Sequence, residues 1–156
     1  MSSISPVEFP PDFEIVTTRI FDAPRETVFE CFSDPQQLAR WWGPKGFKNT
    51  FQEFNLNPRG RWRFVMHAPN GTDYPNENEF TVVEAPARIV FEHLDATTHR
   101  FRTTMTFVDR SGKTALTWRM RFASAEEFHR LKDFLVGANE ENFDRLAAHL
   151  AQRVST

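Results

Sequence analysis

The histidines are the side chains in this sequence best suited to acid–base chemistry near neutral pH. His93 shares an alternating phase with Ile89 and Phe91, so within a strand it would point toward the apolar side of a sheet. Two interpretations stay open for it: a core histidine with a hydrogen-bonding partner, or a polar group that faces a cavity. His67 is out of phase with the apolar residues of its own segment and is expected to face water.

The sequence contains no other pattern of a catalytic or metal site. His93 and His99 are six residues apart without helical spacing, and no set of cysteines or carboxylates completes a zinc site. There is no phosphate-binding glycine loop and no serine in a nucleophile elbow. The single cysteine, Cys31, lies beside an apolar helical face and is expected to be a buried thiol rather than a nucleophile. We therefore expect no metal and no cofactor.

Aromatic usage is the unusual feature of the composition. The chain has 17 phenylalanines and 4 tryptophans but one tyrosine, so its interior should be large, apolar and poor in hydroxyl groups. This composition fits either a phenylalanine-rich core or the lining of an apolar cavity. Of the adjacent Trp41 and Trp42, one indole is expected under the sheet edge. The other would line a cavity entrance or form an interaction patch.

The charge pattern gives no reason to expect nucleic acid or membrane partners. The formal charge is −2, and no long apolar run or leader precedes the first expected strand, so a cytoplasmic location is expected. Five arginines lie on the polar phase of the expected strands and could in principle contact phosphates. Interspersed Glu79 and Glu92 favour a solvated, salt-paired face instead. These arginines are Arg61, Arg63, Arg102, Arg119 and Arg121.

The hydrophobic pattern predicts seven strands, two short helices and one long helix. Short helices are expected to start at Pro24 and Pro35, because proline suits the first position of a helix. The strands are expected at 13–21, 51–56, 61–67, 78–84, 88–94, 100–108 and 113–122, with turn-forming loops at 68–76 and 95–99.

The long helix is expected from Ser124 to about Gln152. Ser124 and Glu127 form a capping box, and the apolar residues recur on one face. Asn139 and Asn142 interrupt that face on its inward side. Gly137 lies on the outer side, where it would weaken or bend the helix.

These elements predict an α+β domain in two layers. Residues 1–12 are expected to form an N-terminal arm and residues 13–153 a single domain. A curved antiparallel sheet of about seven strands would pack on the long C-terminal helix, with the two short helices after strand one. A straight helix across a curved sheet leaves space between them, so a cavity is expected there. Its expected ligand-binding residues are Trp42, Trp62, Phe64, Met66, Phe80, Phe91, His93, Thr103, Met105, Phe107, Trp118, Met120, Leu135, Ala138 and Asn142. Within this set His93, Thr103 and Asn142 would orient a ligand.

Four stretches resemble the activator of heat shock protein 90 ATPase homologue family, in order over roughly residues 13 to 151. They are Arg19 to Pro24 with Val28, Phe29 and Trp41 to Pro44; Asn55 to Trp62; Glu84 to Phe91; and Asp144 to Leu150. This family lies in the START-like, pollen-allergen-like (SRPBCC) superfamily, so the resemblance implies a helix-grip fold. The chain departs from the family at Arg59, where a glycine is usual, and at Ala138, where a tryptophan usually follows the glycine. Both changes bear on the mouth or the volume of a cavity.

The resemblance also implies a range of functions, since superfamily members bind apolar molecules, some are cyclases, and one branch stimulates a chaperone ATPase. The leading expectation is binding of an apolar or aromatic small molecule between the sheet and the last helix. The alternatives are a chaperone-associated interaction domain, or a cyclase- or hydrolase-like cavity enzyme with His93 as its base. The chain is expected to be a monomer or a homodimer.

Overall fold

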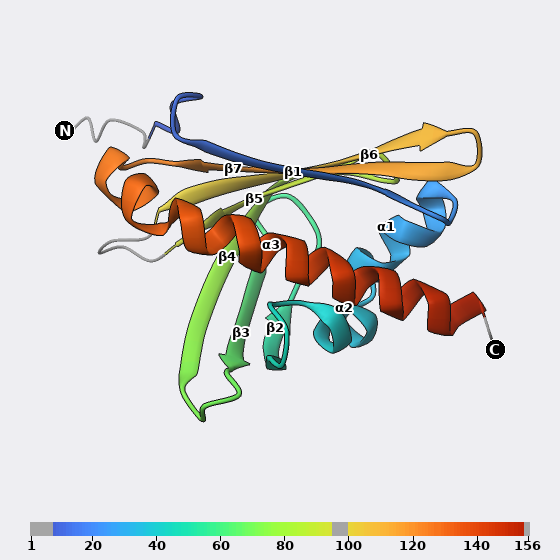
Figure 1. Ribbon diagram of the computed structural model, residues 1–156, viewed down its shortest axis with the longest axis horizontal. Helices are drawn as coiled ribbons and strands as arrows, with labels where there is room; N and C mark the ends of the chain where they lie inside the picture. The colour runs from blue at the N-terminus through green and yellow to red at the C-terminus, as the bar shows by residue number, and fades with distance from the viewer. Residues whose placement is uncertain (1–7, 95–99, 155–156) are drawn as a thin grey trace.

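A computed structural model describes residues 8–94 and 100–154 of the chain and contains one seven-stranded antiparallel sheet with three helices (Figure 1). The strand order is β1-β7-β6-β5-β4-β3-β2. The elements are β1 (Glu14–Phe21), α1 (Arg25–Ser33), α2 (Pro35–Trp41), β2 (Lys48–Phe54), β3 (Arg61–His67), β4 (Asp73–Glu84), β5 (Arg88–His93), β6 (Phe101–Arg110), β7 (Lys113–Phe122) and α3 (Ala125–Val154). The predicted α+β helix-grip architecture is confirmed.

The two short helices after β1 begin where the prolines predict. Pro24 is the N-cap of α1, and Asp34 caps α2 by accepting a hydrogen bond from the Gln36 amide at 3.0 Å. Helix α2 ends at Trp41, and Gly43 follows with φ +103°, a conformation that favours glycine. The chain then turns toward β2.

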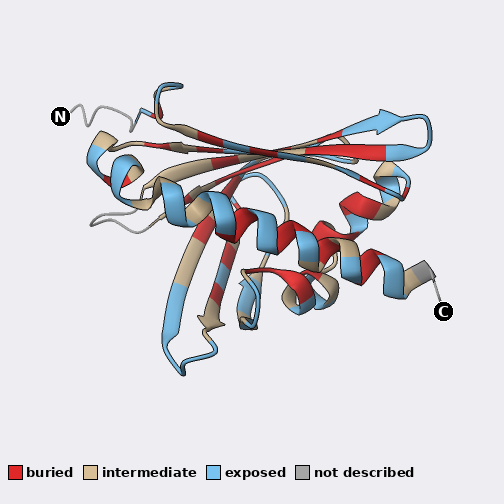
Figure 2. Cartoon of the chain, viewed as in Figure 1, coloured by how far each residue is buried: buried red, intermediate tan, exposed pale blue. Residues whose placement is uncertain are grey.

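Helix α3 lies across one face of the sheet and packs mainly against β1, β7 and α2 (Figure 1). The Ser124 hydroxyl accepts a hydrogen bond from the Glu127 amide at 3.2 Å, as the capping box predicts. Figure 2 shows the buried residues of α3 gathered on its inward side. Asn139 and Asn142 are both among them. The helix continues through Gly137, whose Cα faces open space.

The inner face of the sheet carries the core, and the outer face carries ion pairs. The five arginines of the outer face each pair with a glutamate, which confirms a salt-paired surface. The pairs are Arg61 with Glu77 (2.7 Å), Arg63 with Glu53 (3.5 Å), Arg102 with Glu92 (3.1 Å), and Arg119 and Arg121 with Glu14 (3.0 and 2.7 Å).

Two boundaries differ by three or more residues from the sequence-based expectation. Strand β2 begins at Lys48, and β4 begins at Asp73 although turn-forming residues fill this stretch. Pro75 pairs with Val65 of β3, while the register of β4 with β5 starts only at Asn78. The missing N–H of Pro75 therefore interrupts no described ladder bond on that side.

Only part of the expected N-terminal arm can be placed. Residues 1–7 lie outside the described part of the chain, as do the expected loop 95–99 and His99. Phe9 is buried, with the Arg102 guanidinium 4.7 Å from its ring centre. The end of the arm therefore packs on the outer face of the sheet.

Candidate functional site

The predicted ligand-binding residues come together on the inner face of the sheet and the helix surfaces that cover it, with Phe107 packed on Phe29 and Phe32 of α1 rather than on α3. Met66 and Leu135 are half-buried, and the other thirteen are buried. Strand register brings them side by side, with Phe91 opposite Thr103, Thr103 opposite Met120, and Met105 opposite Trp118. They form one contiguous aromatic and methionine-rich interior.

Trp42 lies at the centre of this interior. Its ring centroid is 5.2 Å from Trp62 on β3, 5.4 Å from Trp118 on β7 and 6.5 Å from Phe91 on β5. Trp41, by contrast, packs on Phe32 and donates its indole N–H to the Cys31 carbonyl at 3.1 Å. Both indoles are buried, so the expectation that one of them forms an exposed interaction patch is wrong.

Three polar atoms of this interior lack a hydrogen-bond partner among the described residues. They are the indole Nε1 of Trp62, the indole Nε1 of Trp118 and the hydroxyl Oγ1 of Thr103. All three residues are at most 4% exposed. Both tryptophans contact Trp42, and Thr103 lies opposite Phe91, whose ring also contacts Trp42. Such orphaned groups are uncommon in native interiors, because each costs about 1–3 kcal/mol.

His93 is a bonded core histidine. Its Nδ1 lies 3.0 Å from Asn78 Oδ1, and its ring stacks on Phe101 at 4.9 Å. An amide oxygen is an acceptor, so Nδ1 carries the proton and the imidazole keeps a fixed orientation. No group of histidine, cysteine and carboxylate side chains in residues 8–94 and 100–154 could hold a metal ion.

Asn142, expected to orient a ligand, instead holds the segment that carries Trp42. Its Oδ1 accepts a hydrogen bond from the Gly43 amide at 3.1 Å, and this contact is buried. One turn later on α3, Arg145 Nη1 donates to the carbonyls of Trp42, Gly43 and Pro44 at 3.0–3.1 Å. Its Nη2 donates to Arg40 O at 3.0 Å.

Arg145 therefore donates to four carbonyls at and beyond the C-terminal end of α2, where a cation is also favoured by the helix dipole. Two of these carbonyls have a second donor: Trp42 O accepts from Asn49 Nδ2 at 2.9 Å, and Pro44 O accepts from the Phe47 amide at 3.1 Å. Burial lowers the pKa of the Arg145 guanidinium. No carboxylate in the described part of the chain lies within ion-pair distance of it. Sequence reasoning missed this role, because an arginine on a helix gives no signal of the carbonyls that it will meet.

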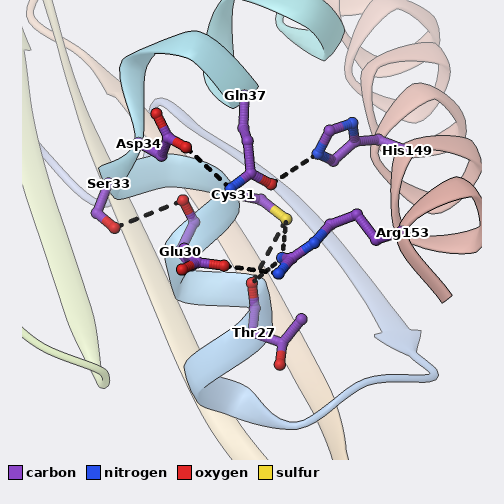
Figure 3. A network of polar contacts seen from close by, with 8 residues as sticks. All are labelled: Thr27, Glu30, Cys31, Ser33, Asp34, Gln37, His149 and Arg153. Carbon is purple, nitrogen blue, oxygen red and sulfur yellow. Dashed lines mark hydrogen bonds and ion pairs between the residues drawn. The ribbon is translucent and has the colours of Figure 1, made fainter. Parts of the chain in front are cut away.

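Two further residues of α3, His149 and Arg153, fasten it to α1 and α2 (Figure 3). With Arg145 they follow a spacing of four residues along the helix. His149 Nε2 lies 2.8 Å from Gln37 Oε1, and Arg153 pairs with Glu30 at 2.6 Å. Burial is the main cause of a lowered pKa for His149, and the positive charges of Arg153 and Arg40 act in the same direction.

Cys31 lies within the same contact network (Figure 3). Its Sγ is 3.7 Å from Arg153 Nη1, and its thiol is fully buried. Burial raises the pKa of this thiol even though the guanidinium opposes the shift. A buried thiol with a raised pKa is a poor nucleophile.

Two hollows of the described residues open at the surface. One, of about 400 Å³, is lined by Gln52, Arg63, Pro75, Asn76, Glu77, His93 and Leu94. The other, of about 480 Å³, is lined by Arg19, Ile20, Phe21, Asp22, Ala147, Leu150 and Ala151. His93 is the one predicted ligand-binding residue found in either lining. The other fourteen predicted ligand-binding residues line neither of these two hollows.

Comparison with known proteins places this fold in a family. Residues 22–154 match the sequence profile described as "Activator of Hsp90 ATPase homolog 1-like protein". No functionally curated protein matches the chain. None of the described helices is both long and apolar enough to cross a membrane.

Several solved structures share the fold. A protein from Arthrobacter aurescens superposes with a TM-score of 0.83 at 24% identity, covering 94% of this chain and 92% of its own. Protein Ms6760 from Mycobacterium smegmatis gives 0.77 at 25% identity, with coverages of 94% and 96%. The AHSA1 protein SPO3351 from Silicibacter pomeroyi gives 0.72 at 23% identity, with coverages of 90% and 99%.

Proposed function

The chain belongs to the Activator of Hsp90 ATPase homolog 1-like family, and on that premise we propose that it binds an apolar or aromatic small molecule between the sheet and α3. The walls of this interior are aromatic rings and methionines, which supply affinity by burial of apolar surface. Methionine side chains adapt their shape to a ligand more readily than branched ones. The ligand would take the place now filled by the Trp42 indole.

The three unpartnered donors carry this proposal. Indole N–H groups can only donate, so the partner that Trp62 and Trp118 lack is a hydrogen-bond acceptor. Thr103 adds a hydroxyl between them in the sheet. No lysine or arginine of the described residues is fully buried, so a carboxylate or phosphate would enter without a counter-charge. The chemistry favours a flat, uncharged molecule with a carbonyl-type oxygen.

A fluorescence titration with two matched probes tests the proposal. One is 6-propionyl-2-(dimethylamino)naphthalene, a neutral aromatic ketone whose emission moves to the blue in apolar surroundings. The other is 2-(dimethylamino)naphthalene, which lacks the carbonyl. We expect the ketone to bind more tightly. The absence of ketone binding, or equal affinities for the two probes, would contradict the proposal.

Variants that remove single donors locate the ketone. Thr103→Val keeps the shape of the side chain, and Trp118→Phe keeps an aromatic ring in a smaller side chain. Each should weaken ketone binding by about 2- to 12-fold, the value of one hydrogen bond. The affinity for the carbonyl-free probe should not change. Trp41→Phe is the matched control, because its indole N–H already bonds to Cys31 O.

A chaperone-associated role is the second candidate, and an exposed apolar pair on α3 favours it. Phe134 is 66% exposed and Val136 is 51% exposed, although apolar groups at a surface often have no partner. The ATPase rate of a purified Hsp90 chaperone, measured with this protein, tests the idea. Stimulation that Phe134→Ser abolishes and Val108→Ser, at another exposed apolar position, leaves intact would support it.

A further inference from the structure

We infer that the Trp42 indole is a removable plug of the ligand site, and that Arg145 and Asn142 form the latch that holds it in place. The inference rests on the proposed function and concerns access to that same site. Residues 42–45, termed the Trp42 loop, would swing away from α3 when a ligand enters.

The plug differs from the other interior aromatics in where it is anchored. Trp62, Phe91 and Trp118 project from hydrogen-bonded strands, so they cannot leave without breaking the sheet. Trp42 projects from the C-cap of α2, where its amide still donates to Leu38 O but its ring lies beyond the last helical residue. Its ring lies against both tryptophans whose N–H groups lack a partner. Removal of this one side chain would expose those two donors to an incoming molecule.

The backbone beside the plug has the features of a pivot. Helix α2 ends at Trp41, and Gly43 has a positive φ of 103°. Pro44 then prevents the helix from continuing. Rotations at the Trp42 dihedrals, with Gly43 absorbing the change in chain direction, could therefore carry the indole outward while α2 stays in place.

The latch consists of polar contacts from one stretch of α3, and Asn49 of β2 adds a bond of 2.9 Å from its Nδ2 to the Trp42 carbonyl. Arg145 donates to the carbonyls of Trp42, Gly43 and Pro44, and Asn142 accepts from the Gly43 amide. Glu141 accepts from the Lys45 amide at 3.1 Å. Water can replace such bonds when the loop opens, so they set the fraction of open molecules without forbidding opening.

The fastenings farther along α3 do not touch the loop. His149 and Arg153 contact Gln37 and Glu30, which belong to α2 and α1. These bonds hold the two short helices in place while the Trp42 loop moves. They also supply a matched control for the latch.

Stopped-flow association of 6-propionyl-2-(dimethylamino)naphthalene tests the latch. A ligand that binds only open molecules associates in proportion to the open fraction. Arg145→Lys keeps the charge but loses the planar fork, so it should raise the association rate about fivefold or more. Arg153→Lys should leave the rate unchanged. Equal association rates in wild type and Arg145→Lys would contradict the role of Arg145 as a latch.

A reversible cross-link tests the loop directly. Lys45→Cys with Glu141→Cys puts one thiol on the loop and one on α3, at two residues that are neighbours because the Lys45 amide donates to the Glu141 carboxylate. In the oxidised protein the association rate of the ketone should fall about tenfold or further, and reduction should restore it. If oxidation, verified by mass spectrometry, leaves the rate unchanged, the loop is not the route of entry.

The fate of Trp42 separates this inference from the proposed function. In protein labelled with 5-fluorotryptophan, the ¹⁹F line missing from Trp42→Phe belongs to the plug. On saturation with the ketone, the chemical shift of this line should move to that of a solvent-exposed indole. The chemical shift of the Trp41 line should not change. Ketone binding with an unchanged Trp42 line would overturn the plug and leave the proposed function standing. No ketone binding in any variant would overturn both.

Discussion

Arg145 on α3 donates a hydrogen bond of 3.1 Å to the backbone carbonyl of Trp42, 103 residues earlier in the chain. The same guanidinium nitrogen also reaches the carbonyls of Gly43 and Pro44. One side chain of the last helix thereby fixes the loop that inserts an indole into the interior of the sheet. The position of the plug depends on α3, although Trp42 itself contacts the strands.

Removal of the guanidinium should destabilise the fold. Arg145→Met keeps most of the apolar stem but removes the donor to the Arg40 and Gly43 carbonyls, whereas Trp42 O keeps Asn49 and Pro44 O keeps the Phe47 amide, so we expect the free energy of unfolding to fall by about 1–3 kcal/mol. Arg145→Lys should cost about half as much, because an ammonium group can still reach some of the carbonyls. Urea unfolding of the variants measures both changes. Equal stability of wild type and Arg145→Met would show that the carbonyls need no protein donor.

Gly43 should tolerate alanine less well than another glycine with a similar backbone. Gly43→Ala forces a side chain onto φ +103° and brings its Cβ to 2.8 Å from Met66 Cε and 3.2 Å from Phe47 Cβ. We expect a loss of about 2 kcal/mol in unfolding free energy. Gly71→Ala is the control, because Gly71 has φ +90° with no atom within 4 Å. The Gly71→Ala variant should lose about 1 kcal/mol of unfolding free energy, from backbone strain alone.

Arg59 occupies a left-handed conformation that suits glycine. Its φ is 70°, and its amide donates to the Phe80 carbonyl at 2.6 Å. Arg59→Gly should raise the free energy of unfolding by about 0.5–1 kcal/mol, as relief of strain outweighs the added freedom of the unfolded chain. Arg59→Ala keeps the Cβ and should change little. A gain in both variants would assign the effect to loss of the arginine side chain.

His149 should make stability depend on pH. Its folded-state pKa lies below the ordinary value of 6.5, so the unfolded chain binds the proton more readily. The stabilisation is complete above pH 6.5 and is lost as the pH falls toward the folded pKa. Burial and the charges of Arg153 and Arg40 cause this shift, while Asp34 opposes it.

His149→Gln removes the titrating group and should flatten this part of the profile. Chemical unfolding at intervals between pH 7.5 and pH 5 provides the comparison. Because other groups also titrate there, the relevant quantity is the difference in slope between variant and wild type. Identical slopes would mean that His149 does not distinguish the folded from the unfolded state.

The fold was predictable because several local signals agree with the tertiary structure. The alternation at 113–122 places one face of β7 in the core, and the capping box at Ser124 marks the start of α3. The inward position of Asn139 and Asn142 also followed from helical periodicity. The early start of β4 could not be predicted in this way, because Pro75 signals a turn. Pro75 is tolerated in the strand because the pairing of β4 with β5 begins only after it, at Asn78.

The candidate site was predictable as a set of inward-facing residues but not as an arrangement. Nothing in the sequence distinguishes the adjacent Trp41 and Trp42. In the structure Trp41 donates a hydrogen bond to Cys31 of α1, whereas Trp42 fills the interior. The role of Arg145 depends on carbonyls about 100 residues away. Periodicity gives the direction of a side chain, whereas its partner depends on long-range packing.

The indole N–H signals of Trp62 and Trp118 provide the most direct test of the proposed binding site. In ¹H–¹⁵N spectra, saturation with 6-propionyl-2-(dimethylamino)naphthalene should shift both signals downfield as their donors gain an acceptor. The Trp41 signal, already bonded to Cys31 O, should stay in place. Shifts confined to Ala147, Ala151 and their neighbours in the surface hollow, with both indole signals unmoved, would contradict binding between the sheet and α3.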